Sequence, residues 1–201
     1  MPDLYHEQLS KEPVAGVDEA GRGPWAGPVI SAAVILGSLA DSYLLKHIKD
    51  SKELSFKARE DIFPQIIQNT KIGIGRAEVE EIDNINILAA THLSMERAIK
   101  SLPMRPNTVL IDGNSKPNID INCKLIVKGD SISSSIAAAS IVAKVLRDRE
   151  MIKLSTAYPG YGFERHKGYG TKEHAEALRA LGPSPVHRHS FKPIKKYLLD
   201  H

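Results

Sequence analysis

The chain has 201 residues, a formal net charge of +3 and 42% hydrophobic residues, which gives room for one α/β domain but not for a second full domain. A single cysteine, Cys123, excludes a disulfide framework and any zinc site built from several cysteines, and we expect it to be a small core residue. There is no charged-then-apolar leader and no uncharged run of transmembrane length, so we expect a cytoplasmic protein without membrane contact.

The charge is distributed unevenly along the chain. Residues 1–100 hold 11 Lys and Arg against 15 Asp and Glu, whereas residues 101–201 hold 16 against 9. Such asymmetry is typical of a face presented to a polyanion, although a solvated basic surface would give the same count.

The first predicted unit is a strand, a turn and a strand. Val14–Val17 and Val29–Leu36 are rich in β-branched and small apolar residues, and the glycines and prolines of Gly21–Pro28 separate them. Asp18 and Glu19 stand where the first strand stops. Neighbouring strand residues point to opposite faces, so both acids serve one site only if the chain bends there or one acid uses its backbone carbonyl. The alternative is a solvated turn with incidental acids.

Further along, the apolar spacing predicts alternating helices and strands. Ser55 caps a helix through Ile66, which Pro64 kinks, and Thr171 caps the last helix. The predicted order is a strand at Lys71–Val79, a helix from Glu80 to Leu102, strands at Thr108–Ile111 and Lys124–Val127, a helix from Ser133 to about Ser155, and a helix ending at Leu181. This order predicts a mixed sheet with helices on its faces.

Two features of the second half of the chain are predicted from its residue types. The helix from Ser133 presents Ala137, Ala138, Ala139 and Ser140, whose small side chains allow close approach to a sheet, so we expect it to pack under the site. The pair His187 and His189 is predicted to lie on the surface rather than to bind a ligand.

Two further acids follow predicted strands. Asp112 precedes Gly113 and Asp130 follows Gly129, and each has a plainer explanation, as a turn residue or as a helix cap. With Asp18 and Glu19 they make four acids at strand ends, where open α/β sheets gather ligands. An oxygen-only cluster suits Mg²⁺ or Mn²⁺, and two such ions can support phosphodiester hydrolysis.

Five sequence blocks then carry a resemblance to a known family. DEAGRGP at 18–24, DSK at 50–52, IDGN at 111–114, GDS with IAAASIVAKVLRDREM ending at Met151, and HKGYGTKEH at 166–174 occur in an order that resembles bacterial ribonuclease HII. The resemblance runs from about Val14 to Lys192. It implies a ribonuclease H-like α/β fold, with a mixed central sheet flanked by helices, in a single domain over residues 1–201 whose C-terminal helical extension begins at about residue 171.

The resemblance also implies an activity and a set of site residues. The activity is hydrolysis of the RNA strand in RNA/DNA hybrids and cleavage 5′ of a ribonucleotide embedded in duplex DNA, which leaves 3′-hydroxyl and 5′-phosphate ends. Asp18, Glu19, Asp112 and Asp130 would hold two divalent ions, Mg²⁺ or Mn²⁺. The substrate-binding residues would be the 2′-hydroxyl reader Gly21, Arg22 and Gly23, the phosphate contact Lys52, and Tyr169 at the RNA-to-DNA junction.

Other positions are less determined by the resemblance. Lys144 and Arg147 can contact substrate or support the site from beneath. The chain departs from the family pattern at Ile132, Ser134 and Gly170, where lysine, proline and proline are expected, which affects the entry loop rather than the reaction class. We expect a monomer whose partners are nucleic acids, and residues 195–201 show no clear motif for a replication clamp.

Three alternatives remain open on the sequence. Ribonuclease HIII shares fold and chemistry but carries an extra N-terminal domain and another residue at the Arg22 position, and the short segment before Val14 argues against it. A noncatalytic nucleic-acid binding module would use the basic half and keep the acids as turns and caps. A DNA junction nuclease would cut all-DNA substrates, for which a reader of the 2′-hydroxyl has no use.

Overall fold

A mixed β-sheet forms the centre of the molecule in this computed structural model, which describes residues 1–37, 42–48 and 54–198. The strand order is β3-β2-β1-β4-β5. β1 pairs antiparallel with β2, and β2 with β3, whereas β1 with β4 and β4 with β5 are parallel. The carboxyl ends of β1, β4 and β5 therefore meet at one edge of the sheet. The strands are β1 (Val14–Ala20), β2 (Val29–Ile35), β3 (Lys71–Ala77), β4 (Thr108–Asp112) and β5 (Asn122–Ile126).

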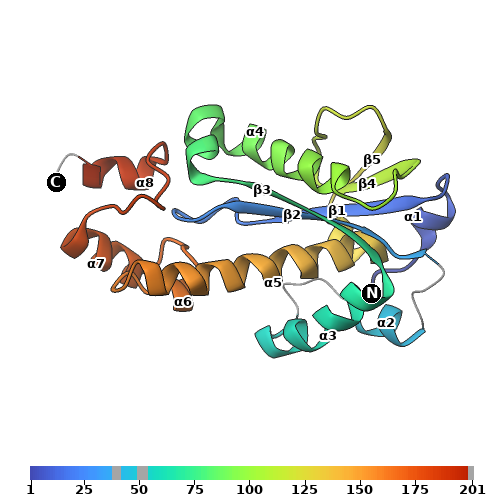
Figure 1. The fold of residues 1–201 in the computed structure, drawn as a ribbon, viewed down its shortest axis with the longest axis horizontal. Helices are drawn as coiled ribbons and strands as arrows, with labels where there is room; N and C mark the ends of the chain where they lie inside the picture. The colour runs from blue at the N-terminus through green and yellow to red at the C-terminus, as the bar shows by residue number, and fades with distance from the viewer. Residues whose placement is uncertain (38–41, 49–53, 199–201) are drawn as a thin grey trace.

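Two long helices cover opposite faces of this sheet (Figure 1). α4 lies on one face and α5 on the other, with α2 and α3 packed beyond α5, while α6, α7 and α8 gather near the far end of α5 (Figure 1). None of the helices in the described ranges is long and apolar enough to cross a bilayer. The helices are α1 (Tyr5–Gln8), α2 (Ser42–His47), α3 (Phe56–Asn69), α4 (Val79–Lys100), α5 (Ser134–Ala157), α6 (Phe163–His166), α7 (Lys172–Leu181) and α8 (Lys192–Lys195), with 3-10 turns η2 (Gly129–Ser131) and η3 (Lys196–Leu198).

Strand periodicity divides the core into two layers. In β2, which is buried along its whole length, Ala32 and Val34 face the cluster with α5, whereas Ala33 and Ile35 face the cluster with α4. The predicted close packing of the Ser133 helix is confirmed, because Ala137–Ala139 are fully buried in the cluster with β2. This helix thereby packs directly against β1 and β2.

The helix caps follow the predicted chemistry. The Ser55 side chain accepts from the Ala58 N–H, and the Thr171 side chain accepts from the His174 N–H. The cap of α5 is Ser133, so Asp130 does not serve as that cap. Pro64 lies inside α3.

The boundaries of other elements differ from the prediction. β5 begins at Asn122 rather than at Lys124, and α4 is interrupted at Asn86, where the backbone adopts φ 70° and ψ 165°. The Asn86 side-chain oxygen then accepts from the N–H groups of Leu88 and Ala89, so it restarts the helix in the manner of an N-cap.

Two predicted placements are wrong. His187 is fully buried rather than on the surface, because its ring packs against Tyr161 and Phe163, whereas His189 is exposed. Cys123 is half-buried at the margin of the α4-side cluster rather than in the core, since it lies on the outermost strand.

Candidate active site

The divergence of two parallel strands opens the site. β1 pairs with β4 as far as Val17 opposite Ile111, and with β2 as far as Ala20 opposite Ile30. Asp18 and Asp112 are the residues that directly follow the last β1–β4 pair. Their side chains therefore occupy the edge where the two strands part, at the carboxyl ends of both.

A third acid reaches the same place from the turn after β5. Asp130 lies in η2 and is 2% exposed, and Asp18 is 4% exposed. One carboxylate oxygen from each of Asp18, Asp112 and Asp130 lies within 4.8 Å of the others. Hydrogen bonds orient this group, since the Gly129 N–H donates to Asp112 Oδ1 at 2.7 Å and the Glu19 N–H donates to Asp18 Oδ1 at 2.7 Å.

Burial and mutual repulsion act together on these acids. Burial raises the pKa of Asp18 well above its usual range, and the nearby charges of Glu19 and Asp112 raise it further, while a hydrogen bond from Ser140 opposes the shift. A cluster of buried oxygens that repel one another fits a divalent cation, which would supply the missing positive charge. Carboxylate oxygens are also the ligands that Mg²⁺ and Mn²⁺ prefer.

Glu19 lies beside this group rather than within it. Burial raises its pKa as well, and the Arg22 guanidinium, whose Nη1 lies 3.4 Å from Glu19 Oε1, partly offsets that effect. Both neighbouring acids line one cavity at the end of β1. The predicted strand end before Asp18 is wrong, because β1 continues to Ala20 and its last three residues still pair with β2.

The cavity has a volume of about 230 Å³ and brings most of the predicted site residues together. Lys144 lines it while pairing with Asp148 at 2.7 Å. Lys52 lies outside the described residues. The lining residues are Asp18, Glu19, Ala20, Gly21, Arg22, Gly23, Asp112, Ser140, Lys144, Arg147 and Tyr169.

Tyr169 and the Gly21–Gly23 turn are neighbours across this cavity. A Cβ atom added to Gly23 would lie 3.6 Å from Tyr169 Cε1, and the tyrosine is 46% exposed. The next residue, Gly170, lies under the Trp25 ring, where an added Cβ would come within 2.1 Å of Trp25 Cζ2. That contact gives a physical reason for glycine at this departure from the family pattern.

The departure at Ser134 also has a local explanation. Its backbone N–H donates to the carbonyl of Asp3 at 2.9 Å, a bond that proline could not make, and the N-terminal segment is thereby tied to the start of α5. Ile132, the third departure, is 39% exposed, and nothing in the described part of the chain explains the choice.

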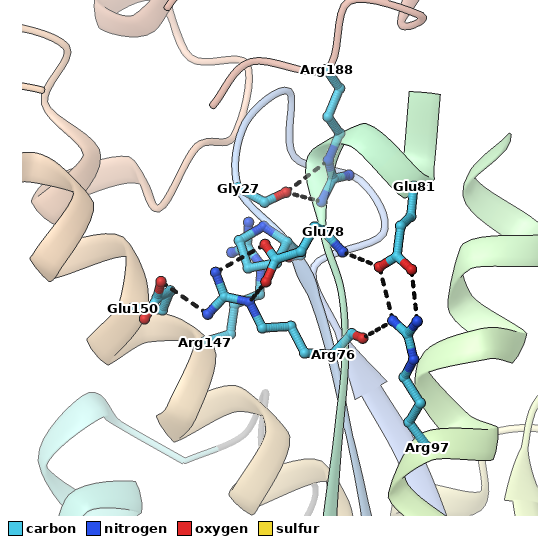
Figure 2. A network of polar contacts seen from close by, with 9 residues as sticks. Gly27, Arg76, Glu78, Glu81, Arg97, Arg147, Glu150 and Arg188 are labelled. Atoms are coloured by element: carbon cyan, nitrogen blue, oxygen red, sulfur yellow. Dashed lines mark hydrogen bonds and ion pairs between the residues drawn. The ribbon is translucent and has the colours of Figure 1, made fainter. Parts of the chain in front are cut away.

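Two residues that support the site have no sign of this role in the sequence. Ser140 is one of several small residues of α5, and its hydroxyl bonds Asp18. Arg188 is fully buried and donates to the carbonyl of Gly27, as Figure 2 shows, and to other carbonyls of the loop between β1 and β2. Nothing local in a basic C-terminal segment distinguishes a buried arginine from a solvated one.

Comparisons with known proteins identify the family of the chain. Residues 15–194 match the family described as Ribonuclease HII. The chain is 52% identical over 187 residues to Ribonuclease HII of Coxiella burnetii (strain RSA 493 / Nine Mile phase I), covering 92% of this chain and 91% of the relative. It is 49% identical over 200 residues to Ribonuclease HII of Paramagnetospirillum magneticum, covering 99% of this chain and all of the relative.

A solved structure supports the fold independently. The crystal structure of ribonuclease H2 from Pyrococcus horikoshii OT3 superposes with a TM-score of 0.78 at 27% identity, covering 93% of this chain and 97% of that one. The mixed sheet with helices on both faces is therefore a ribonuclease H-like fold. With a family match over most of its length and relatives at about half identity, the chain belongs to the ribonuclease HII family and is a ribonuclease H hydrolase.

Proposed function

We propose that this chain hydrolyses the RNA strand of RNA/DNA hybrids and cuts duplex DNA on the 5′ side of an embedded ribonucleotide. The observation that carries the proposal is the grouping of three carboxylates within 4.8 Å, in a site whose cavity is also lined by the Gly21–Gly23 turn. A metal centre beside a loop with exposed backbone combines hydrolysis with recognition of a ribose.

The acids would hold two divalent ions, Mg²⁺ or Mn²⁺. Asp18, Asp112 and Asp130 offer oxygens to a shared position, and Glu19 adds a fourth carboxylate at the rim. When bound, such ions supply an activated water and stabilise the leaving 3′-oxygen, which leaves 3′-hydroxyl and 5′-phosphate ends. The Gly129 N–H and the Ser140 hydroxyl keep Asp112 and Asp18 in position.

Recognition of the substrate would fall to other residues that line the cavity. The backbone of Gly21, Arg22 and Gly23 would contact the ribose 2′-hydroxyl, and Tyr169 would stack at the RNA-to-DNA junction. Lys52 would contact a phosphate, as the family resemblance implies. The substrate-bound protein would act as a monomer in the cytoplasm.

A duplex with one ribonucleotide tests this proposal against its alternatives. The protein is incubated with that duplex, with a matched all-DNA duplex and with a continuous hybrid, in Mg²⁺, Mn²⁺ or chelator, and the cut ends are mapped. We expect a nick 5′ of the ribonucleotide, only with metal, and an intact all-DNA duplex. Metal-independent binding without any nick would favour the noncatalytic module, and cleavage of the all-DNA duplex would favour the junction nuclease.

A further inference from the structure

We propose that Arg188 is a positioning residue for the ribose-reading turn, because it draws the carbonyls of that turn inward and so directs the N–H groups of Arg22 and Gly23 towards the substrate. The inference rests on the proposed function, since it assigns a role in ribonucleotide recognition. Arg188 lies in the C-terminal segment between α7 and α8, more than 160 residues from the turn.

The guanidinium of Arg188 makes five hydrogen bonds to the loop. Its Nη2 donates to the carbonyl of Gly21 at 2.5 Å and to that of Gly27 at 2.8 Å, and its Nε donates to Gly27 at 3.0 Å. Its Nη1 donates to the carbonyls of Arg22 at 2.9 Å and Pro24 at 2.8 Å. All five donor positions of one side chain therefore serve four carbonyls of a single loop.

The geometry of the peptide bond converts these contacts into an orientation. In a trans peptide the carbonyl of one residue and the N–H of the next point in opposite directions. Because the carbonyls of Gly21 and Arg22 point at Arg188, the N–H groups of Arg22 and Gly23 point away from it. Arg22 and Gly23 are exposed and line the cavity, whereas Gly21, Pro24 and Gly27 are buried.

A second arginine also holds the returning half of the loop. The Trp25 carbonyl accepts from the Arg188 backbone N–H at 2.8 Å, and Arg147 of α5 donates to the carbonyls of Ala26 and Pro28, each at 3.1 Å. Figure 2 shows Arg188 entering from the C-terminal segment, with Arg147 on the α5 side. Within the loop, Arg147 thus holds only carbonyls of the returning half, whereas the Arg188 side chain also binds the carbonyls of Gly21 and Arg22 in the ribose-reading turn.

Lysine cannot reproduce the contacts of Arg188 in this position. Lysine offers three donors on one nitrogen, whereas the planar guanidinium offers five in a fixed fork that matches several carbonyls at once. Arg188→Lys keeps the charge but loses the planar guanidinium, so it should hold the turn less firmly. Arg188→Met loses both and should leave the turn without these hydrogen bonds.

The experiment uses Arg188→Lys, Arg188→Met and the control Arg105→Met. Arg105 is exposed and donates to the single carbonyl of Asp120, so the control also removes a guanidinium bound to a carbonyl. Nucleic-acid binding is measured in chelator, with a duplex containing one ribonucleotide and a matched all-DNA duplex, and Mn²⁺ binding is measured separately without chelator or nucleic acid. The chain has one tryptophan, Trp25, which lies in this loop, so its quenching by acrylamide reports loop order without any activity.

We expect the preference for the ribonucleotide duplex to fall to about one in Arg188→Met and to an intermediate value in Arg188→Lys. Affinity for all-DNA duplex and binding of Mn²⁺ should stay within about twofold of the parent, and Trp25 quenching should rise in the same order as preference falls. The control should match the parent in every readout. A merely structural role would lower all affinities together.

A folded Arg188→Met variant that keeps the parental preference would overturn the inference. If that variant does not fold, Arg188→Lys decides in the same way, and failure of both to fold would also contradict the inference by making Arg188 a residue of global stability. A parent protein that neither prefers nor nicks the ribonucleotide duplex would instead refute the proposed function.

Discussion

Burial and two neighbouring charges disfavour a negative charge on Asp18. It is almost fully buried, and its pKa is raised by burial and then by the charges of Glu19 and Asp112. A divalent cation would remove that penalty, so the protein without metal keeps an electrostatic cost that the metal-bound protein does not.

The variant Asp18→Asn should therefore melt at a higher temperature than the parent in chelator, because it removes one of the repelling charges and keeps an oxygen for the Glu19 N–H. For a chain of this size each kcal/mol gained corresponds to about 2 to 4 °C. The exposed Asp61→Asn serves as control and should leave the melting temperature unchanged. A lower melting temperature for Asp18→Asn in chelator would count against buried repulsion at this site.

Tyr169 offers a second test at a single residue. Tyr169→Phe keeps the ring that lies beside Gly23, whereas Tyr169→Ala removes both the ring and the hydroxyl. A stacking contact contributes roughly 1 to 3 kcal/mol, so Tyr169→Ala should cleave a lone-ribonucleotide duplex about tenfold more slowly or worse. The loss should be smaller on a continuous hybrid, where many registers offer a ribose. If Tyr169→Ala loses the same cleavage rate on both substrates, Tyr169 has a structural role and does not recognise the junction.

At the scale of elements, a buried pair of histidines connects α7 to the segment after it and to Tyr169. The Ser184 N–H donates to His187 Nδ1 at 2.9 Å, so the His187 proton lies on Nε2, which donates to His174 Nε2 at 2.9 Å. The remaining His174 proton on Nδ1 then donates to the Tyr169 carbonyl at 3.0 Å. This order requires both rings to be neutral.

Acid should therefore weaken the C-terminal helices. Burial lowers the pKa of His174 to about 4 and that of His187 to about 3, below the ordinary value of 6.5. The unfolded chain takes up protons first, so the stabilisation is complete above pH 6.5 and is lost as the pH falls from 6.5 towards 4.

Melting temperatures between pH 4.5 and 8 check this expectation. The parent and the exposed-site control His189→Gln should lose stability along the same curve below pH 6.5. His187→Gln should be less stable at pH 8 but should show a shallower slope. A slope in His187→Gln equal to that of the parent would show that these rings do not carry the pH dependence.

Elements with strong local signals could be predicted from the sequence, and elements without them could not. The caps at Ser55 and Thr171 and the buried strands follow from residue types within one turn or one strand. The four-residue helices α6 and α8 are too short to show an apolar period. The break at Asn86 could not be predicted from a glycine or proline, since neither is present there. Asparagine itself adopts the positive φ.

At the scale of the whole molecule, the basic residues gather in the second half of the chain. Residues 144–196 contain 12 Lys and Arg against 5 Asp and Glu. The structure refines this count, since Arg147 and Arg188 are buried against carbonyls and Lys144 is paired with Asp148. Arg149 and Arg165 are exposed but paired with glutamates, so the basic side chains available to phosphates are fewer than the count suggests.

Hybrid affinity should consequently fall as salt rises, while the position of the cut stays fixed, because phosphate contacts set affinity and the turn sets the position. Binding titrations from 50 to 300 mM salt, with mapping of the cut at each point, check both halves of this statement. Binding that does not respond to salt would exclude a phosphate-tracking surface.

The parts of the site that the sequence could not predict depend on long-range contacts. The four acids follow predicted strands, so their positions could be predicted from strand ends and glycines. Burial of Arg188 and His187 depends on partners in the β1–β2 loop and in α7, and a basic polar segment carries no local sign of those partners. Tertiary structure, rather than residue type, decides whether such side chains are solvated.

The central claim is that the acid cluster is the metal-dependent centre of hydrolysis, and the cleavage rate of Asp112→Asn tests it most directly. Rates are measured on a duplex with one ribonucleotide, for the parent and the variant, at Mg²⁺ concentrations raised to saturation. Because the variant loses a negative oxygen ligand from the shared position, we expect a loss of roughly 100-fold or more that excess Mg²⁺ does not restore. A folded Asp112→Asn variant that cleaves at nearly the parental rate in saturating Mg²⁺ would contradict the account.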